Sequence, residues 1–210
     1  MLTSFVDGSK TMIEMAALAN YLDFDIDIDG MHGPNSTYDE LNSIFIPKTS
    51  GGILENTNVV DFAFGVAPGV FAIVYSEDDY VNYEMEYLKM GKGPYWTLYR
   101  PYHLTSLEIP RTIMKLMVEK ETQLSAKKWN VEVVAHSKKD LEAGTNLGSI
   151  GGENIYGKAM RVENSKNLAP LGIAENNILN SEVKKGEPIE IENIDITDNQ
   201  LYKYWLSQNS

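Results

Sequence analysis

The chain has 210 residues and a formal net charge of −12 at pH 7. A protein this acidic repels a phosphate backbone, so we expect no nucleic-acid partner. Hydrophobic residues make up 43% and charged residues 23% of the chain, which is typical of a globular protein and too apolar for a disordered one.

The composition also excludes several kinds of site. There is no cysteine, so disulfides, thiolate zinc sites and a cysteine nucleophile are excluded. No apolar run approaches the roughly 20 residues that span a bilayer. Residues 1–5 lack the basic and apolar pattern of a secretory signal. We therefore expect a cytoplasmic protein with no membrane partner.

The first part of the chain predicts helices and apolar strands. Apolar residues at helical spacing predict a helix from Lys10 to about Leu22, capped by Asp7 or Ser9 or by a box of Thr11 and Glu14. Residues 38–50 predict a short helix and a loop. β-branched and aromatic residues then predict strands over 59–64 and 70–75, which we expect to pair with both faces buried.

Three further elements follow before the composition of the chain changes. Residues 80–90 predict a helix that ends with Gly91 as its C′ residue, and residues 95–99 predict a strand. A proline at position 110 suits the first turn of a helix through about Glu121. Short strands and turns follow, beginning with a strand over 131–135. We therefore predict two domains, residues 1–124 and 125–210.

Two segments of the second part share one pattern. In Asp140–Gly144 and in Glu182–Gly186, an acid is followed by an aliphatic residue, two further residues and a glycine. An aliphatic residue stands three positions after each glycine. The pattern indicates an internal two-fold repeat, in which both glycines adopt a positive φ.

Both parts of the chain resemble known families. The second part resembles the SAF domain, a small β-clip module, through Val134-Ala135, Asp140–Gly144 and Val183–Ile189. The whole chain is similar to homoserine dehydrogenase-like oxidoreductases that carry a C-terminal SAF domain. The blocks that carry this second resemblance are Asp7–Lys10, Glu14–Ala16, Phe64–Phe71, Gly93–Leu104 and Ser149–Gly157.

The resemblance implies a fold and a reaction class. The implied fold is α+β: a mixed sheet with helices in a substrate and oligomerisation domain, followed by an SAF-like β-clip. The implied reaction is NAD(P)-dependent oxidation or reduction of a small polar hydroxy or keto metabolite by a homo-oligomer. A reductoisomerase of isoprenoid precursor synthesis belongs to the same group, so membership does not define the substrate.

The cofactor-binding part of the family is missing from these residues. Its members bind NAD(P) with an N-terminal Rossmann domain, and no strand–GxGxxG–helix unit occurs in this sequence. The glycine run Gly91–Pro94 contains a proline and precedes no helix. We therefore expect the chain to hold no cofactor alone, and to be a fragment or subunit that is inactive without a Rossmann domain or subunit.

The candidate catalytic residues are Lys10 and Asp7. A lysine near a carbonyl can relay the proton that accompanies hydride transfer, or it can anchor a carboxylate or phosphate. The start of a helix also favours anions. Glu14 lies on the same helical face and is a candidate substrate-binding residue that, like Asp7, could orient Lys10. The alternative is a solvated lysine, a capping aspartate and a surface ion pair.

Arg100 and His103 are the other candidate substrate-binding residues. They follow a predicted apolar strand, which is a common position for site residues. Arginine suits a carboxylate or phosphate, and histidine donates or accepts a proton near neutral pH. Alternatively, Arg100 pairs with an acid and His103 is a buried structural residue.

We predict no metal site. Residues 23–30 resemble the start of a calcium loop, but a loop that began at Asp25 would need a glutamate where Ser36 stands. Two other functions stay open. One is a non-catalytic SAF-type protein that binds a sugar acid or a phosphorylated ligand. The other is a structural subunit of a two-chain enzyme.

Overall fold

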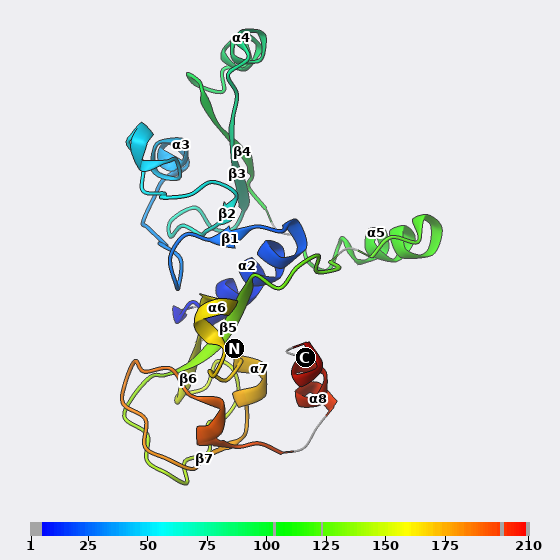
Figure 1. Ribbon diagram of the computed structural model, residues 1–210. Coiled ribbons are helices and arrows are strands. Elements are labelled where there is room, and N and C mark those ends of the chain that lie inside the picture. Colours follow the sequence, from blue (N-terminus) through cyan, green and yellow to red (C-terminus); the bar gives the residue numbers. More distant parts are fainter. Residues whose placement is uncertain (1–5, 103, 123, 198–199, 209–210) are drawn as a thin grey trace. The chain divides into compact units, whose positions relative to one another are not determined.

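Helices and short antiparallel strand pairs make up the protein (Figure 1). The computed structural model describes residues 6–102, 104–122, 124–197 and 200–208. The predicted α+β class is confirmed. None of the helices in these ranges combines the length and apolar character that crossing a bilayer requires.

The chain divides into two units by its contacts. Residues 1–31 and 126–210 form one, which we call the split unit, and residues 32–125 form the other, the central unit. The sequence also changes character near residue 125. Residues 6–31, however, belong to the same unit as the C-terminal part of the chain. The substrate-domain and SAF identities of these regions stay predictions.

The split unit is built on one antiparallel strand pair, β5 (Val131–Ser137) and β6 (Ile155–Arg161). Helix α2 (Ser9–Leu22) packs against both strands and buries Met12, Ala16 and Ala19. The helix therefore exists where the periodicity of its apolar residues predicts it, and its apolar stripe finds its partner more than a hundred residues later in the chain.

Short elements complete the split unit. The remaining helices are α6 (Val162–Ser165), α7 (Leu171–Ala174), η4 (Ile191–Asn193) and α8 (Gln200–Gln208), and the remaining strands are β1 (Asp25–Ile26), β7 (Ile178–Leu179) and β8 (Ile194–Asp195). β7 pairs with β8, and single bridges join β5 to Pro170 and Pro188. Beyond residue 130, strands and bridges thus dominate, as predicted.

The two similar segments lie side by side. Leu141 forms an antiparallel bridge with Val183, and the backbone N–H of Lys185 donates to Oδ1 of Asp140 over 2.9 Å. Gly144 has φ 86° and Gly186 has φ 84°, so the predicted positive φ is confirmed at both glycines. The repeat therefore has a structural counterpart: two equivalent turns whose flanking residues pair.

The central unit begins with short helices around a small apolar core. Its first elements are η1 (Tyr38–Glu40), α3 (Leu41–Ile44), η2 (Lys48–Ser50) and the strand β2 (Val59–Val60). Leu41, Phe45 and Leu54 form the buried centre of this core.

A two-stranded ribbon follows, formed by β3 (Val70–Tyr75) and β4 (Tyr95–Arg100). The predicted pairing of residues 59–64 with 70–75 is wrong, because β3 takes β4 as its antiparallel neighbour. Burial on both faces is wrong as well. Phe71 and Ile73 pack against the small apolar core, but every residue of β3 is exposed or half-buried.

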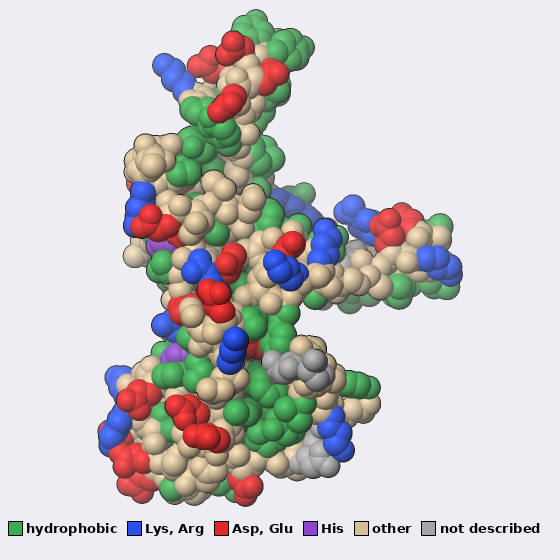
Figure 2. Space-filling model, in the orientation of Figure 1, with side chains coloured by type: hydrophobic (Ala, Val, Ile, Leu, Met, Phe, Trp, Pro, Cys, Tyr) green, Lys and Arg blue, Asp and Glu red, His purple; other side chains and the backbone are tan. Residues whose placement is uncertain are grey.

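Helix α4 (Asp79–Tyr87) lies in the connection between β3 and β4. The carboxylate of Asp78 accepts from the N–H groups of Tyr80 and Val81, each over 2.9 Å, and caps its start. The helix ends before the predicted residue, so Gly91 is not its C′ residue. Figure 2 shows hydrophobic and acidic side chains together over α4, where three tyrosines are exposed: Tyr80, Tyr83 and Tyr87.

The last helix of the central unit is α5 (Ile109–Met114), which continues as a wider π turn, η3 (Lys115–Glu119). Pro110 lies in its first turn, as predicted.

Candidate functional site

The candidate catalytic residues Asp7 and Lys10 flank a tight turn in the split unit. Gly8 is the N-cap of α2 and has φ 80°, a conformation that favours glycine. Since the N-cap is a glycine, neither Ser9 nor the box of Thr11 and Glu14 caps the helix. Oδ1 of Asp7, however, accepts from the N–H of Ser9, the first residue of the helix, over 2.9 Å.

A lysine from the far end of β5 reaches this turn. Nζ of Lys138 lies 2.6 Å from Oδ2 of Asp7 and donates to the carbonyl oxygen of Gly152 over 2.6 Å. The side chains of Asp7 and Lys138 are only 14% and 18% exposed. Burial by itself would raise the pKa of Asp7, but the hydrogen bonds from Lys138 and Ser9 outweigh it and lower that pKa below its ordinary value.

Ser9 anchors the turn to β6. Its side chain is fully buried, and its Oγ accepts from the N–H of Gly157 over 2.8 Å. A Cβ at Gly157 would lie 2.7 Å from both Leu171 Cδ2 and Val133 Cγ1. A glycine at this position therefore lets the strand, the turn and their neighbours come together.

Lys10 and Glu14 lie on the outside of α2. Their side chains are about half exposed, at 47% and 50%, and Nζ of Lys10 is 3.9 Å from Oε1 of Glu14. This is a long surface ion pair of the kind that contributes little to stability. The ammonium group of Lys10 therefore remains accessible from solvent, and its catalytic role stays a prediction.

Arg100 belongs to the central unit, at the end of β4. It pairs with Glu108 and stacks over the ring of Tyr102, 4.7 Å from its centroid. The hydrogen bond to Glu108 raises the pKa of Arg100. Pairing with an acid is the structural alternative that we set beside substrate binding. Arg100 and Glu108 also line a small hollow of about 230 Å³. His103 lies outside the described residues.

The candidate residues therefore fall into two groups. Asp7, Lys10 and Glu14 lie together at the start of α2, and Arg100 lies in the other unit.

Lys138 was not predicted by the sequence analysis. The available signal was its position directly after a buried strand, where polar residues often serve a site.

A second buried polar pair lies in the central unit. His32 lies in a turn in which Met31 and Gly33 have positive φ. Nδ1 of His32 also lies 2.7 Å from Oδ2 of Asp61, whose carboxylate accepts from the N–H groups of His32, Gly33 and Phe62. A carboxylate in this position fixes the orientation of an imidazole.

The described residues contain no Rossmann-type dinucleotide fold. The pairs β3–β4, β5–β6 and β7–β8 are all antiparallel. Within residues 6–102, 104–122, 124–197 and 200–208, no strand leads through a glycine-rich turn into a helix of a doubly wound sheet. These ranges therefore contain no Rossmann-type glycine-rich turn that would bind a pyrophosphate group.

The chain matches a known family over about half of its length. A family model described as oxidoreductase DRL, catalytic domain, matches residues 1–109, about half of the chain. No curated protein matches the sequence. The matched region contains all five predicted site residues: Asp7, Lys10, Glu14, Arg100 and His103.

Proposed function

The chain belongs to the oxidoreductase DRL family through its catalytic domain, residues 1–109, and we propose that it supplies the substrate-binding part of an NAD(P)-dependent enzyme resembling homoserine dehydrogenase. The proposed substrate is a small polar hydroxy or keto metabolite. The family match carries this proposal, because it covers the Asp7–Lys10 turn.

Lys10 is the proposed proton-relay or anchoring residue. Its half-exposed ammonium group stands in the first turn of α2, where the helix dipole also favours an anion. A substrate carboxylate or carbonyl oxygen beside it gains a charge-assisted hydrogen bond. Asp7, kept ionised by Lys138, holds the turn from which Lys10 projects.

The cofactor is proposed to come from a Rossmann domain or subunit outside these 210 residues. The antiparallel strand pairs of the described residues support this division, since they offer no dinucleotide fold. The proposed enzyme is a cytoplasmic homo-oligomer. The exposed apolar side chains of β3, β4 and α4 support an assembly through the central unit.

Residues 125–210 are proposed to form an SAF-like β-clip. The observation in favour is the pair of equivalent glycine turns at Gly144 and Gly186, together with the bridge between Leu141 and Val183.

The proposal is tested with and without the Rossmann component. Calorimetric titration of the isolated chain with NADPH is expected to show no tight binding. Addition of the cognate Rossmann domain or subunit is expected to give substrate-dependent NAD(P)H oxidation across a panel of small keto acids and keto alcohols. Tight NADPH binding by the isolated chain would contradict the division of labour. Ligand binding without turnover in the assembled protein would favour a binding protein.

A further inference from the structure

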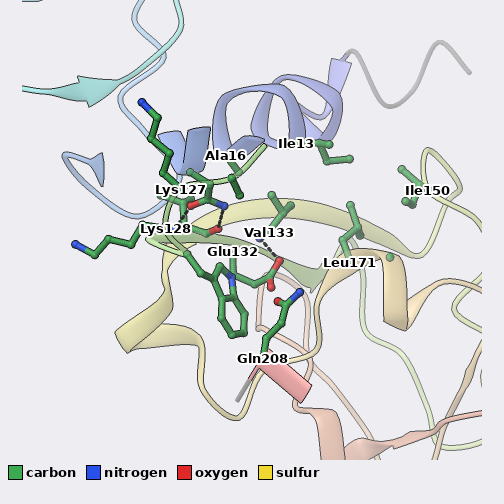
Figure 3. A pocket seen from close by; sticks show the side chains of 14 residues that line it. Ile13, Ala16, Lys127, Lys128, Glu132, Val133, Ile150, Leu171 and Gln208 are labelled. Atoms are coloured by element: carbon green, nitrogen blue, oxygen red, sulfur yellow. Dashed lines mark hydrogen bonds between the residues drawn. The ribbon is translucent and has the colours of Figure 1, made fainter. Parts of the chain in front are cut away.

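A pocket of about 820 Å³ lies within the split unit, apart from the Asp7–Lys138 pair. Residues of α2, β5, segment 126–129, α7 and α8 line it (Figure 3). Its volume lies in the range of small-molecule sites. The aliphatic residues in its wall include Ile13, Ala16, Val131, Val133, Ile150 and Leu171.

One carboxyl group interrupts this apolar wall. Glu132 projects from β5, and its Oε1 accepts from the N–H of Val133 over 2.8 Å. Burial raises the pKa of Glu132, an effect that contacts with Val133, Trp205 and Trp129 only partly oppose. Among the residues that the structure describes, no basic group lies within ion-pair distance of this carboxylate.

The lysines at the pocket do not supply that missing charge. Figure 3 shows the side chains of Lys127 and Lys128 extending away from the carboxyl group of Glu132. Nζ of Lys128 lies 3.5 Å from Asp23, and Nζ of Lys127 lies over the ring of Tyr21, 5.3 Å from its centroid. Both ammonium groups therefore interact outside the pocket.

We propose that this pocket binds a small organic ammonium ion with an apolar body, and that Glu132 is its counter-charge. A buried carboxylate is stabilised by a cation that it contacts directly. The aliphatic wall takes the apolar body, and the indole of Trp129 offers a ring to the cation. An anionic ligand would meet a like charge, and a neutral one would leave the hydrogen-bonded Glu132 without a counter-charge. The net charge of −12 also attracts cations to the protein.

This site does not depend on the proposed oxidoreductase activity, so it is tested on the chain by itself. The probe is phenethylamine, which is protonated near neutral pH, and its comparator is phenethyl alcohol, which has the same body without the charge. Hydrocinnamate is the anionic comparator. Calorimetry and tryptophan fluorescence follow binding, because Trp129 and Trp205 both contact Glu132.

We expect the amine to bind at least about tenfold more tightly than the alcohol, and the anion to bind least. Glu132→Gln is expected to abolish the preference for the amine while the alcohol still binds. Glu142→Gln, an exposed acid-to-amide change, is the matched control and is expected to leave the preference unchanged.

Two results would overturn the proposal. One is equal affinity of the wild-type chain for amine and alcohol. The other is amine binding that survives Glu132→Gln in full. If that variant does not fold by circular dichroism, Gly172→Leu replaces it. No atom lies within 4 Å of a Cβ at Gly172, which lines the pocket. Its new side chain is expected to fill the pocket and weaken amine binding, and unchanged binding would refute the site.

Discussion

Nζ of Lys138 and Oδ2 of Asp7 lie 2.6 Å apart and join the end of β5 to the turn before α2. Both side chains are largely shielded from water, and Lys138 also holds the carbonyl group of Gly152. The pair therefore connects three segments of the split unit at Asp7, the first residue of the Asp7–Lys10 turn. The pair ties the Asp7–Lys10 turn to the fold of the split unit.

We expect Lys138→Met to destabilise the chain by about 3 kcal/mol, because it leaves the largely buried Asp7 carboxylate without its cation. Urea unfolding measures this change. Lys184→Met is the matched control, because Lys184 pairs with Asp140 on the surface, where both side chains are more than half exposed. This control is expected to change the stability by less than about 1 kcal/mol. Similar losses in the two variants would contradict the assignment.

The same pair predicts a dependence on pH. The pKa of Asp7 is lower in the folded chain than its ordinary value of 3.8, so the folded state binds fewer protons than the unfolded state in acid. The stabilisation is therefore complete above about pH 4 to 5 and is lost as the pH falls through the folded pKa. In Lys138→Met, we expect the pKa of Asp7 to rise, as measured by carboxyl NMR. A pKa that does not move would show that Lys138 does not hold the charge.

His136 predicts a second dependence on pH, near neutrality. Burial lowers its pKa from 6.5, and the carbonyl group of Val134 and the charge of Asp29 only partly oppose this effect. Below about pH 6.5, the His136 side chain therefore binds a proton in the unfolded chain more readily than in the folded chain. We expect the unfolding free energy to fall below about pH 6.5, by at most about 1.4 kcal/mol per pH unit. His136→Gln should flatten this part of the profile, and an unchanged slope would exclude His136 as its origin.

Gly157 and Gly172 differ in the space around them, and this difference tests how tightly the chain packs beside the Asp7–Lys10 turn. We expect Gly157→Ala to destabilise the chain by about 1–3 kcal/mol, because its methyl group would lie 2.7 Å from Leu171 and Val133. Gly172→Ala meets open space in α7 and is expected to be neutral or to stabilise by up to about 1 kcal/mol. Thermal unfolding of both variants measures the two stability changes. If Gly172→Ala were more destabilising than Gly157→Ala, β6 would have relaxed to accommodate the new methyl group.

Lys10→Ala separates catalysis from folding. In the protein assembled with its Rossmann component, we expect turnover to fall by about 100-fold or more, as for loss of a general acid or base. Stability should change by less than about 0.5 kcal/mol, because the side chain is about half exposed. Lys139→Ala, another exposed lysine, should change neither quantity. Unchanged turnover in Lys10→Ala would remove Lys10 from the site.

Local patterns of the sequence determined the elements that depend on neighbouring residues. The apolar spacing in α2, the proline at the start of α5 and the glycines at positions 144 and 186 each specify local backbone geometry. These features appear in the structure where the sequence predicts them. The Asp7–Lys10 block was named from the sequence as a candidate site, and its role stays a prediction.

Only the tertiary structure decided which segments meet. β3 pairs with β4 and not with residues 59–64, and α2 packs on β5 and β6 from the other end of the chain. The tertiary structure also places Lys138 beside Asp7 and Glu132 in the wall of a pocket. A periodic pattern shows that a face is buried but does not name its partner. Closing a long loop costs nearly the same for several alternative partners, so the side chains that fit together select among them.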